Sequence, residues 1–377
     1  MKAALCVNGK ESLFKYLSER SIPHKQCGKL IVASSDAEVP QLHNIFQQAT
    51  KNGVDLRVLD SFDVNIMEPG VRCSKALYSP RTGIFDSHQY MQNLQADAEM
   101  AGTVFVYNCS VLSGFCNSAN REDRDDGVQF KNESLPIDKG GIVLESTQGL
   151  IHADIVINAS GLHSIQFAQQ LSGYPQNLLP MAYFSKGNYF DLKSLEPPFR
   201  KLVYPIPEVG GLGIHATVDM GGAVRFGPDV EWLVEEPMDV CNSAYKTPHQ
   251  SRSSSSFIAG EKYDKYQHKH SVPLDYTVDI TRKKIFYDAI KKYYPNICED
   301  NLVPAYCGIR PKLYGPSGPG PVITKLSNNV RNLHDFVIEG PETHGVRGLV
   351  NLFGMESPGL TSSLSIADHV AKLLKID

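Results

Sequence analysis

Two residues in predicted strands are of types suited to acid–base and anion chemistry. His215 lies in the alternating stretch 213–217, where its imidazole could take a proton from a hydroxyl group. Arg310 follows the apolar stretch 303–307, and a guanidinium held by such a strand could bind a carboxylate through two hydrogen bonds. The same residue types also occur as a histidine satisfied by its neighbours and as an arginine in an ordinary salt bridge.

Two further segments carry candidate site residues. His344, next to Gly345, could act in the same way as His215. Lys186, Gly187 and Asn188 form a glycine-containing strand, and a flat ring could lie against the backbone of such a strand.

The segment 348–363 is the strongest local pattern. It combines an apolar strand, a turn at Gly354, a Pro-Gly loop and a helix with apolar residues at helical spacing. A helix start opened by glycine exposes free N–H groups and the positive end of the helix dipole. We expect Thr361 or Ser362 to cap the first turn. Such an end suits a phosphate, a carboxylate or the anionic edge of a reduced flavin, although many α/β proteins simply end in this shape.

A second strand, turn and helix occupy residues 154–164, with Gly161 at the turn. Two glycine turns that follow buried strands favour a nucleotide-sized cofactor without identifying it.

The order of elements predicts an α/β protein with an antiparallel sheet in the middle of the chain. Helices are expected to end near residue 21 and to cover 36–51, 87–101 and 281–294. Strands are expected at 29–33, 56–59 and 103–111, a hairpin at 142–157, and the sheet at 181–226. The polar stretches 117–141 and 241–272 are predicted to be disordered loop insertions.

Composition excludes several classes of protein. A formal net charge of -4 over 377 residues gives no electrostatic basis for binding nucleic acid. The eight cysteines include no Cys-x-x-Cys pair, which predicts free thiols and no zinc site. His268 and His270 lie in a polar stretch without carboxylates, so no metal is expected there. No apolar run is long enough to cross a bilayer, which leaves peripheral membrane contact open.

These segments together resemble the L-2-hydroxyglutarate dehydrogenases, a family of the D-amino-acid-oxidase-like flavoprotein superfamily. The resemblance covers nearly the whole chain, and its specificity comes from many ordered matches. They are residues 5–9, 27–33, 79–86, 204–207, 213–217, 225–232, 308–312 and 348–363.

The resemblance implies an enzyme that binds FAD and oxidises L-2-hydroxyglutarate to 2-oxoglutarate. It also implies a quinone or flavoprotein carrier as electron acceptor and, in eukaryotes, a mitochondrial location. By similarity, Arg310 would bind a substrate carboxylate and His215 or His344 would take the hydroxyl proton. The residues implied on the substrate side are Lys186, Gly187 and Asn188, and those implied at the flavin are Gly161, Gly354, Gly359, Leu360 and Thr361.

The sequence departs from the superfamily at its N-terminus. The Gly-x-Gly-x-x-Gly turn that holds the FAD pyrophosphate is not found in it. We therefore expect a truncated Rossmann-like FAD-binding domain at 85–175 and 335–377, with a mixed or antiparallel-sheet substrate domain at 1–84 and 176–334. We expect the missing unit to be encoded upstream of Met1; the alternative is a protein that lacks it.

Two other functions stay open from the sequence. One is a different amino-acid or hydroxy-acid oxidase of the same superfamily, which would share the flavin and the arginine. The other is a non-catalytic fragment that cannot hold FAD.

Overall fold

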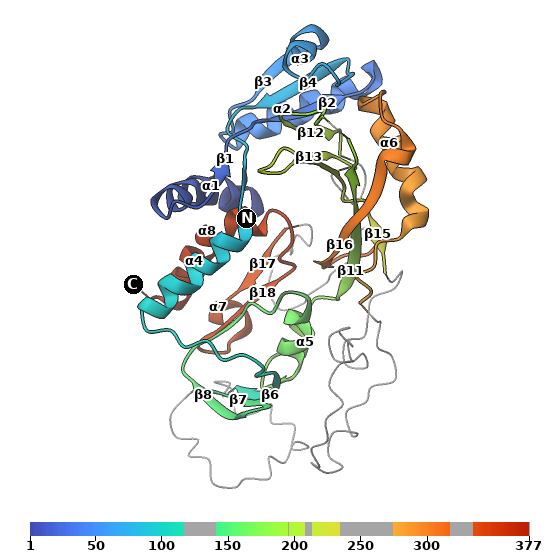
Figure 1. Cartoon of the computed structure of the whole chain (residues 1–377). Coiled ribbons are helices and arrows are strands. Elements are labelled where there is room, and N and C mark those ends of the chain that lie inside the picture. Colours follow the sequence, from blue (N-terminus) through green and yellow to red (C-terminus); the bar gives the residue numbers. More distant parts are fainter. Residues whose placement is uncertain (117–140, 195, 208–212, 234–273, 317–334, 377) are drawn as a thin grey trace.

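The computed structural model (Figure 1) describes residues 1–116, 141–194, 196–207, 213–233, 274–316 and 335–376. The predicted loop insertions fall outside these residues, apart from Gly141, and so do His268 and His270. The described chain is mixed α/β, as predicted, with strands in several sheets.

The largest sheet in the described part has nine strands in the order β15-β11-β14-β13-β12-β2-β4-β3, with β16 paired to β11. Most of its pairs are antiparallel, and β12 and β2 run parallel. The bounds are β2 (Lys29–Ala33), β3 (Arg57–Asp60), β4 (Lys75–Ser79), β11 (Tyr183–Leu192), β12 (Leu202–Pro205), β13 (Ala216–Val218), β14 (Val224–Phe226), β15 (Glu231–Trp232) and β16 (Leu302–Lys312).

Helix α6 (Lys283–Tyr293) covers one face of this sheet. Its buried Phe286 and Ile290 share a core with alternate strand residues such as Val203 and Phe190. Because side chains alternate between the faces of a strand, the neighbours of these residues lie on the opposite face. We call this opposite face the site face. It carries Lys29, Tyr189, Tyr204, His215 and Arg310, with His215 just before β13.

A smaller sheet lies below the large one in Figure 1, between two helices. Its order is β17-β18-β9, with β18 buried along its whole length and parallel to β9. Val350 and Leu352 of β18 pack toward helix α8, whereas Leu349 and Phe353 face the core that includes helix α5. The bounds are β9 (Val156–Asn158), β17 (Val337–Glu339), β18 (Leu349–Phe353), α5 (Ser164–Gln169) and α8 (Gly359–Leu374).

A four-stranded sheet of order β10-β6-β7-β8 contains a hairpin, β7 and β8, in the first part of the predicted range 142–157. The end of that range was assigned wrongly, because β9 pairs with β18 in the smaller sheet. The expected strand at 103–111 is wrong, because residues 103–110 form no strand and β6 begins at Val111. The apolar residues of the segment 103–110, such as Val104 and Tyr107, are exposed, and no described strand pairs with them. The bounds are β6 (Val111–Cys116), β7 (Ile142–Ser146), β8 (Gly149–Ala153) and β10 (Leu171–Ser172).

Helix α1 packs against α8, although the sequence assigned residues 1–84 to the substrate side. Gly9 permits this contact, since a Cβ there would lie 2.6 Å from the carbonyl oxygen of Thr361. Helix α4 joins the pair through a 2.8 Å hydrogen bond between Tyr90 and Ser363. The remaining α-helices and strands are α1 (Lys2–Glu19), α2 (Val39–Lys51), α3 (Ser61–Met67), α4 (Ser87–Met100), α7 (Pro341–His344), β1 (His24–Lys25) and β5 (Ile84–Phe85).

Candidate functional site

Arg310 is held on the site face by two hydrogen bonds from one end of its guanidinium. Its Nη2 donates to the backbone oxygen of Asp229 at 2.8 Å and to Ser185 Oγ at 3.3 Å. Its Nε is buried and has no partner among the described residues. A buried donor without an acceptor is costly, so this guanidinium is oriented and ready for a further acceptor.

Strand register separates the three candidate residues of β11. Ser185 pairs with Arg310, and Gly187 pairs with Gly308, so these four residues lie on one face. The intervening Lys186 and Asn188 point to the other face, where α6 lies. Of the three residues from 186 to 188, only Gly187 lies on the face of Arg310, and its place beside the substrate stays a prediction.

The partners of Lys186 and Asn188 confirm their orientation. Lys186 forms an ion pair with Asp275 at 3.5 Å. The Asn188 amide donates to Glu231 at 2.9 Å and accepts from the Asp279 backbone N–H at 3.0 Å. These contacts hold the segment before α6 against the sheet, which is a structural role.

Two facing glycines leave space beside Arg310. A Cβ on Gly308 would meet no atom within 4 Å, which marks open space in front of the strand. A Cβ on Gly187 would lie 3.1 Å from Arg310 Nη2 and closer still to Pro228. Gly187 therefore lets the guanidinium lie flat on the sheet, and Gly308 keeps the adjacent room free.

His215 is buried and oriented as a neutral base. Its Nδ1 lies 3.0 Å from the carbonyl oxygen of Gly213, which can only accept, so Nδ1 carries the proton. No hydrogen bond to Nε2 is found within the described chain. Burial, together with the positive charges of Lys29 and Arg310, lowers the pKa of His215 to about 4. The ring thus offers an unprotonated Nε2 at neutral pH.

The His215 ring stacks on Tyr204, with centroids 3.8 Å apart and 17° between the planes. Lys29 Nζ lies over the same tyrosine, 4.8 Å from its ring centroid. Burial raises the pKa of Tyr204 to about 12, so the phenol stays neutral. Burial raises the pKa of the Cys6 thiol in α1, and the positive charge of Lys29 and the side chain of Ser362 in α8 offset part of this rise. These contacts connect the site face to the start of α8.

The start of α8 presents free backbone donors. Pro358 precedes it without a side-chain cap, and no acceptor for the N–H groups of Leu360 and Thr361 is found among the described residues. The expected cap from Thr361 or Ser362 is wrong, since the Ser362 hydroxyl donates to the Pro358 carbonyl instead. A Cβ on Gly359 would meet nothing within 4 Å.

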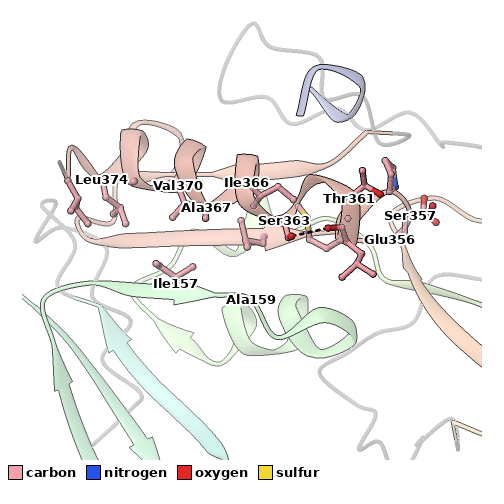
Figure 2. Close-up of a pocket in the computed structure, with 17 residues that line it drawn as sticks. Ile157, Ala159, Glu356, Ser357, Thr361, Ser363, Ile366, Ala367, Val370 and Leu374 are labelled. Carbon is pink, nitrogen blue, oxygen red and sulfur yellow. Dashed lines mark hydrogen bonds between the residues drawn. The ribbon is translucent and has the colours of Figure 1, made fainter. Parts of the chain in front are cut away.

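A cavity of about 810 Å³ runs along α8 from this end, as Figure 2 shows. Gly359, Leu360 and Thr361 are among its lining residues. In Figure 2 Thr361 lies at one end of the cavity, and Ile157 of β9 lies across from the helix. Its walls are mainly apolar, and its size is within the range of cofactor sites. Free N–H groups beside an apolar cavity fit a flavin, which is flat and carries an anionic edge when reduced.

The other two predicted glycines do not line this cavity. Gly161 follows β9 with φ +60 and has open space around its Cα, so close approach of a ligand stays a prediction. Gly354 has φ +66, and a Cβ there would lie 2.8 Å from Leu313. The observed reason for Gly354 is therefore its close packing against the end of β16.

His344 lies apart from the other candidates. It ends α7 in the lower part of Figure 1, far from β13. It is buried, accepts a hydrogen bond at Nδ1 from the Val346 N–H at 3.1 Å, and packs near Tyr174. The structure therefore brings Arg310 and His215 onto one face and does not bring His344 to them.

Sequence reasoning missed Lys29, Tyr204 and the Asp229 carbonyl. Lys29 had a signal, since it is a charged residue at the start of an otherwise apolar strand. Tyr204 and Asp229 had none, because stacking and backbone contacts between distant strands leave no mark on local spacing.

The fold is that of known flavin oxidases. L-alpha-glycerophosphate oxidase from Mycoplasma pneumoniae, with FAD bound, matches the whole chain with a TM-score of 0.70, over 80% of its own length and at 16% identity. Glycine oxidase from Geobacillus kaustophilus matches 99% of the chain with a TM-score of 0.64, over 79% of its own length and at 16% identity.

Sequence comparison is more specific than this shared fold. The chain is 40% identical to the mitochondrial L-2-hydroxyglutarate dehydrogenase of Arabidopsis thaliana, across 98% of this chain and 71% of the plant protein. The human protein of that name is 27% identical, across 98% and 75% of the two chains. The model of the FAD dependent oxidoreductase family matches residues 2–373. The chain thus belongs to the FAD dependent oxidoreductase family, among the L-2-hydroxyglutarate dehydrogenases.

Proposed function

We propose that this protein oxidises L-2-hydroxyglutarate to 2-oxoglutarate with FAD. The observation that carries the proposal is the pairing, on one sheet face, of a guanidinium with an unpartnered Nε and an imidazole with an unprotonated Nε2. A 2-hydroxy acid needs both groups, one for its carboxylate and one for its hydroxyl proton. The plant relative's name supports the choice of this hydroxy acid.

The chain's own residues divide the work. Arg310 binds the carboxylate next to the reacting carbon, because its Nε still lacks an acceptor and its Nη2 is anchored to Asp229. His215 takes the hydroxyl proton at Nε2, and Gly213 fixes the tautomer that makes this nitrogen the acceptor. FAD, when bound, supplies the acceptor for the hydride that leaves the substrate carbon. The product is the ketone.

Gly359, Leu360 and Thr361 would hold the flavin through their backbone at the start of α8. The glycine gives access to the backbone, and the cavity along α8 offers an apolar wall. In this part of the proposal Gly161 approaches the cofactor from the end of β9. The division into a cofactor domain and a substrate domain belongs to the same proposal, with α1 moved to the cofactor side.

We further propose that electrons pass to a quinone or a flavoprotein carrier, and that the protein works in mitochondria at or near a membrane surface. The names of the plant and human relatives support the mitochondrial location. No helix in the described part of the chain is long and apolar enough to cross a membrane.

The test is anaerobic mixing of the FAD-loaded protein with a panel of substrates. The panel contains L-2-hydroxyglutarate, D-2-hydroxyglutarate, glycine, sarcosine and D-alanine. We expect L-2-hydroxyglutarate alone to bleach the flavin absorption band and to yield 2-oxoglutarate. Bleaching by an amino acid instead would make the protein an amino-acid oxidase of the same family. Failure to bind FAD at all would indicate a non-catalytic chain.

A further inference from the structure

Lys29 is a cation with no anionic partner among the described residues. It lies half-buried on the site face at the start of β2, and no hydrogen bond or ion pair of its Nζ is found among the described residues. Its neighbours are the ring of Tyr204 and the thiol of Cys6, and neither is an anion at neutral pH. Burial leaves the charge of Lys29 poorly solvated and lowers its pKa.

The other cations of the sheet contrast with Lys29. Among the described residues of β2, β11, β12, β13, β14 and β16, Lys29 and Arg310 are the only cations without a carboxylate partner. The remaining pairs are Lys186 with Asp275, Arg225 with Asp191, and Lys312 with Glu356. An unpaired, poorly solvated charge is expensive, so its presence in a folded protein points to a ligand that neutralises it.

Lys29 and Arg310 share a common neighbour in His215. Both positive charges act on the pKa of its imidazole. The ring of Tyr204 contacts both Lys29 and His215. Arg310 lies on β16, on the same face of the sheet as His215. Two cations that have no carboxylate partner in the described part of the chain therefore lie around one proton acceptor.

The proposed substrate has a charge pattern that complements this arrangement. L-2-hydroxyglutarate carries one carboxylate beside its hydroxyl group and a second carboxylate at the far end of its five-carbon chain. Arg310 is occupied by the first carboxylate in the proposed function. We propose that Lys29 binds the second, distal carboxylate and thereby makes the site selective for dicarboxylates. The inference rests on the proposed function of the same site.

Lysine suits this position physically. A compact ammonium on a flexible stem can bind one carboxylate oxygen from β2 while Tyr204 shields its stem from water. A 2-hydroxy acid with a methyl group at the far end would leave Lys29 buried and unneutralised. Such a substrate is rejected because the site loses a charge-assisted contact and retains the desolvation cost.

The test compares two substrates that differ only at the distal end. L-2-hydroxyglutarate and L-2-hydroxyvalerate have the same chain length, and only the first has a distal carboxylate. In Lys29→Met we expect kcat/KM for L-2-hydroxyglutarate to fall about 100-fold or more, mainly through KM, with little change for L-2-hydroxyvalerate. Lys29→Arg should keep part of the preference for L-2-hydroxyglutarate over L-2-hydroxyvalerate. The control is Lys284→Met, which removes one partner of an exposed ion pair of α6 and should leave kcat/KM for both substrates unchanged.

Binding without turnover gives a second measurement. Calorimetric titration of the wild-type holoenzyme with glutarate and with butyrate should show tighter binding of the dicarboxylate, and Lys29→Met should remove the difference. If Lys29→Met does not fold, the wild-type comparison and Lys29→Arg still decide. The inference is overturned if Lys29→Met retains its preference for L-2-hydroxyglutarate, or if wild-type protein binds both acids equally. Absence of wild-type turnover of L-2-hydroxyglutarate would instead overturn the proposed function.

Discussion

The imidazole of His215 stacks on the ring of Tyr204, with centroids 3.8 Å apart and 17° between the planes. Together with the 3.0 Å hydrogen bond from Nδ1 to the Gly213 carbonyl, this stack fixes both the plane and the tautomer of the imidazole. A base fixed in this way does not need to reorient before it accepts the proton of a substrate hydroxyl group. The stack therefore connects a packing contact to the chemistry of the site.

Replacing His215 by asparagine should slow turnover while leaving substrate binding largely intact. The amide keeps a polar group of similar reach but provides no basic nitrogen, so kcat should fall about 100-fold to 10,000-fold with little change in KM. Steady-state kinetics with L-2-hydroxyglutarate measure kcat and KM separately. The control is His88→Asn, since His88 is exposed on α4. A variant with normal kcat would remove His215 from the reaction.

The pH dependence follows from the low pKa of His215, about 4. Above this pKa the ring is neutral and accepts a proton; below it the ring is already protonated. The value of kcat/KM should therefore stay on its plateau as pH falls through 6.5, where an ordinary histidine titrates, and decline only near pH 4. A pH–rate profile tests this, and an acid limb near 6.5 that His215→Asn abolishes would contradict it.

The same pKa affects stability with a definite sign. The unfolded histidine, with a pKa near 6.5, binds a proton that the folded one refuses until about pH 4. The free energy of unfolding should thus fall as pH drops from 6.5 toward 4, and this part of the fall should be smaller in His215→Asn. Denaturant titrations at several pH values measure it.

Strands β11 and β16 show which features of the site the sequence can predict and which it cannot. Alternation predicted β11, and an apolar stretch predicted β16. Residue type made Arg310 a candidate, and the glycine-containing strand made residues 186–188 candidates. These patterns could not say which of these residues share a face, because register is set by pairing between distant segments. The observed pairing of Ser185 with Arg310 places Gly187 in the site and turns Lys186 and Asn188 toward α6.

Local sequence patterns also could not predict that His215 and Arg310 lie on the same face of the sheet. The antiparallel chain from β11 through β14 and β13 to β12 brings His215 onto the same face as Arg310 and Lys29. His344 matched the same chemical criterion but ends a short helix in the other part of the molecule. Residue type predicts candidates, whereas only tertiary packing chooses among them.

Replacing Arg310 by lysine should weaken substrate binding sharply. Lysine keeps the charge but loses the planar fork, and it cannot bond the Asp229 carbonyl and a carboxylate in the same geometry. We expect KM for L-2-hydroxyglutarate to rise about 100-fold. The matched control is Arg57→Lys, at an exposed position in β3. Normal turnover by Arg310→Lys would show that the carboxylate is bound elsewhere.

A side chain added at Gly308 should block the site without harming the fold. A Cβ there meets nothing within 4 Å, so Gly308→Val should leave the melting temperature unchanged or slightly higher, since valine suits a strand. The added methyl groups would occupy the space beside Arg310, and kcat/KM should fall about tenfold or more. Gly308→Ala should have a smaller effect in the same direction. Unchanged kinetics in the valine variant would place the substrate elsewhere.

The ion pair between Lys312 and Glu356 should be a main connection between the large sheet and the start of α8. Lys312 Nζ lies 2.7 Å from Glu356 Oε2, and the two side chains are only 5% and 12% exposed. Glu356→Gln removes the negative charge at constant shape and leaves Lys312 buried without its counter-charge. We expect the free energy of unfolding to fall by about 2–4 kcal/mol, measured by chemical denaturation.

An exposed pair provides the comparison that makes this test decisive. Lys284 and Asp288 lie 2.6 Å apart on α6, with 61% and 59% of their side chains exposed. Asp288→Asn should change stability by less than about 0.5 kcal/mol, because water already screens that pair. Glu356 also lines the cavity beside Gly359, so Glu356→Gln should lose flavin more readily on gel filtration. Equal stability losses in the two variants would show that Lys312 and Glu356 do not hold the site together.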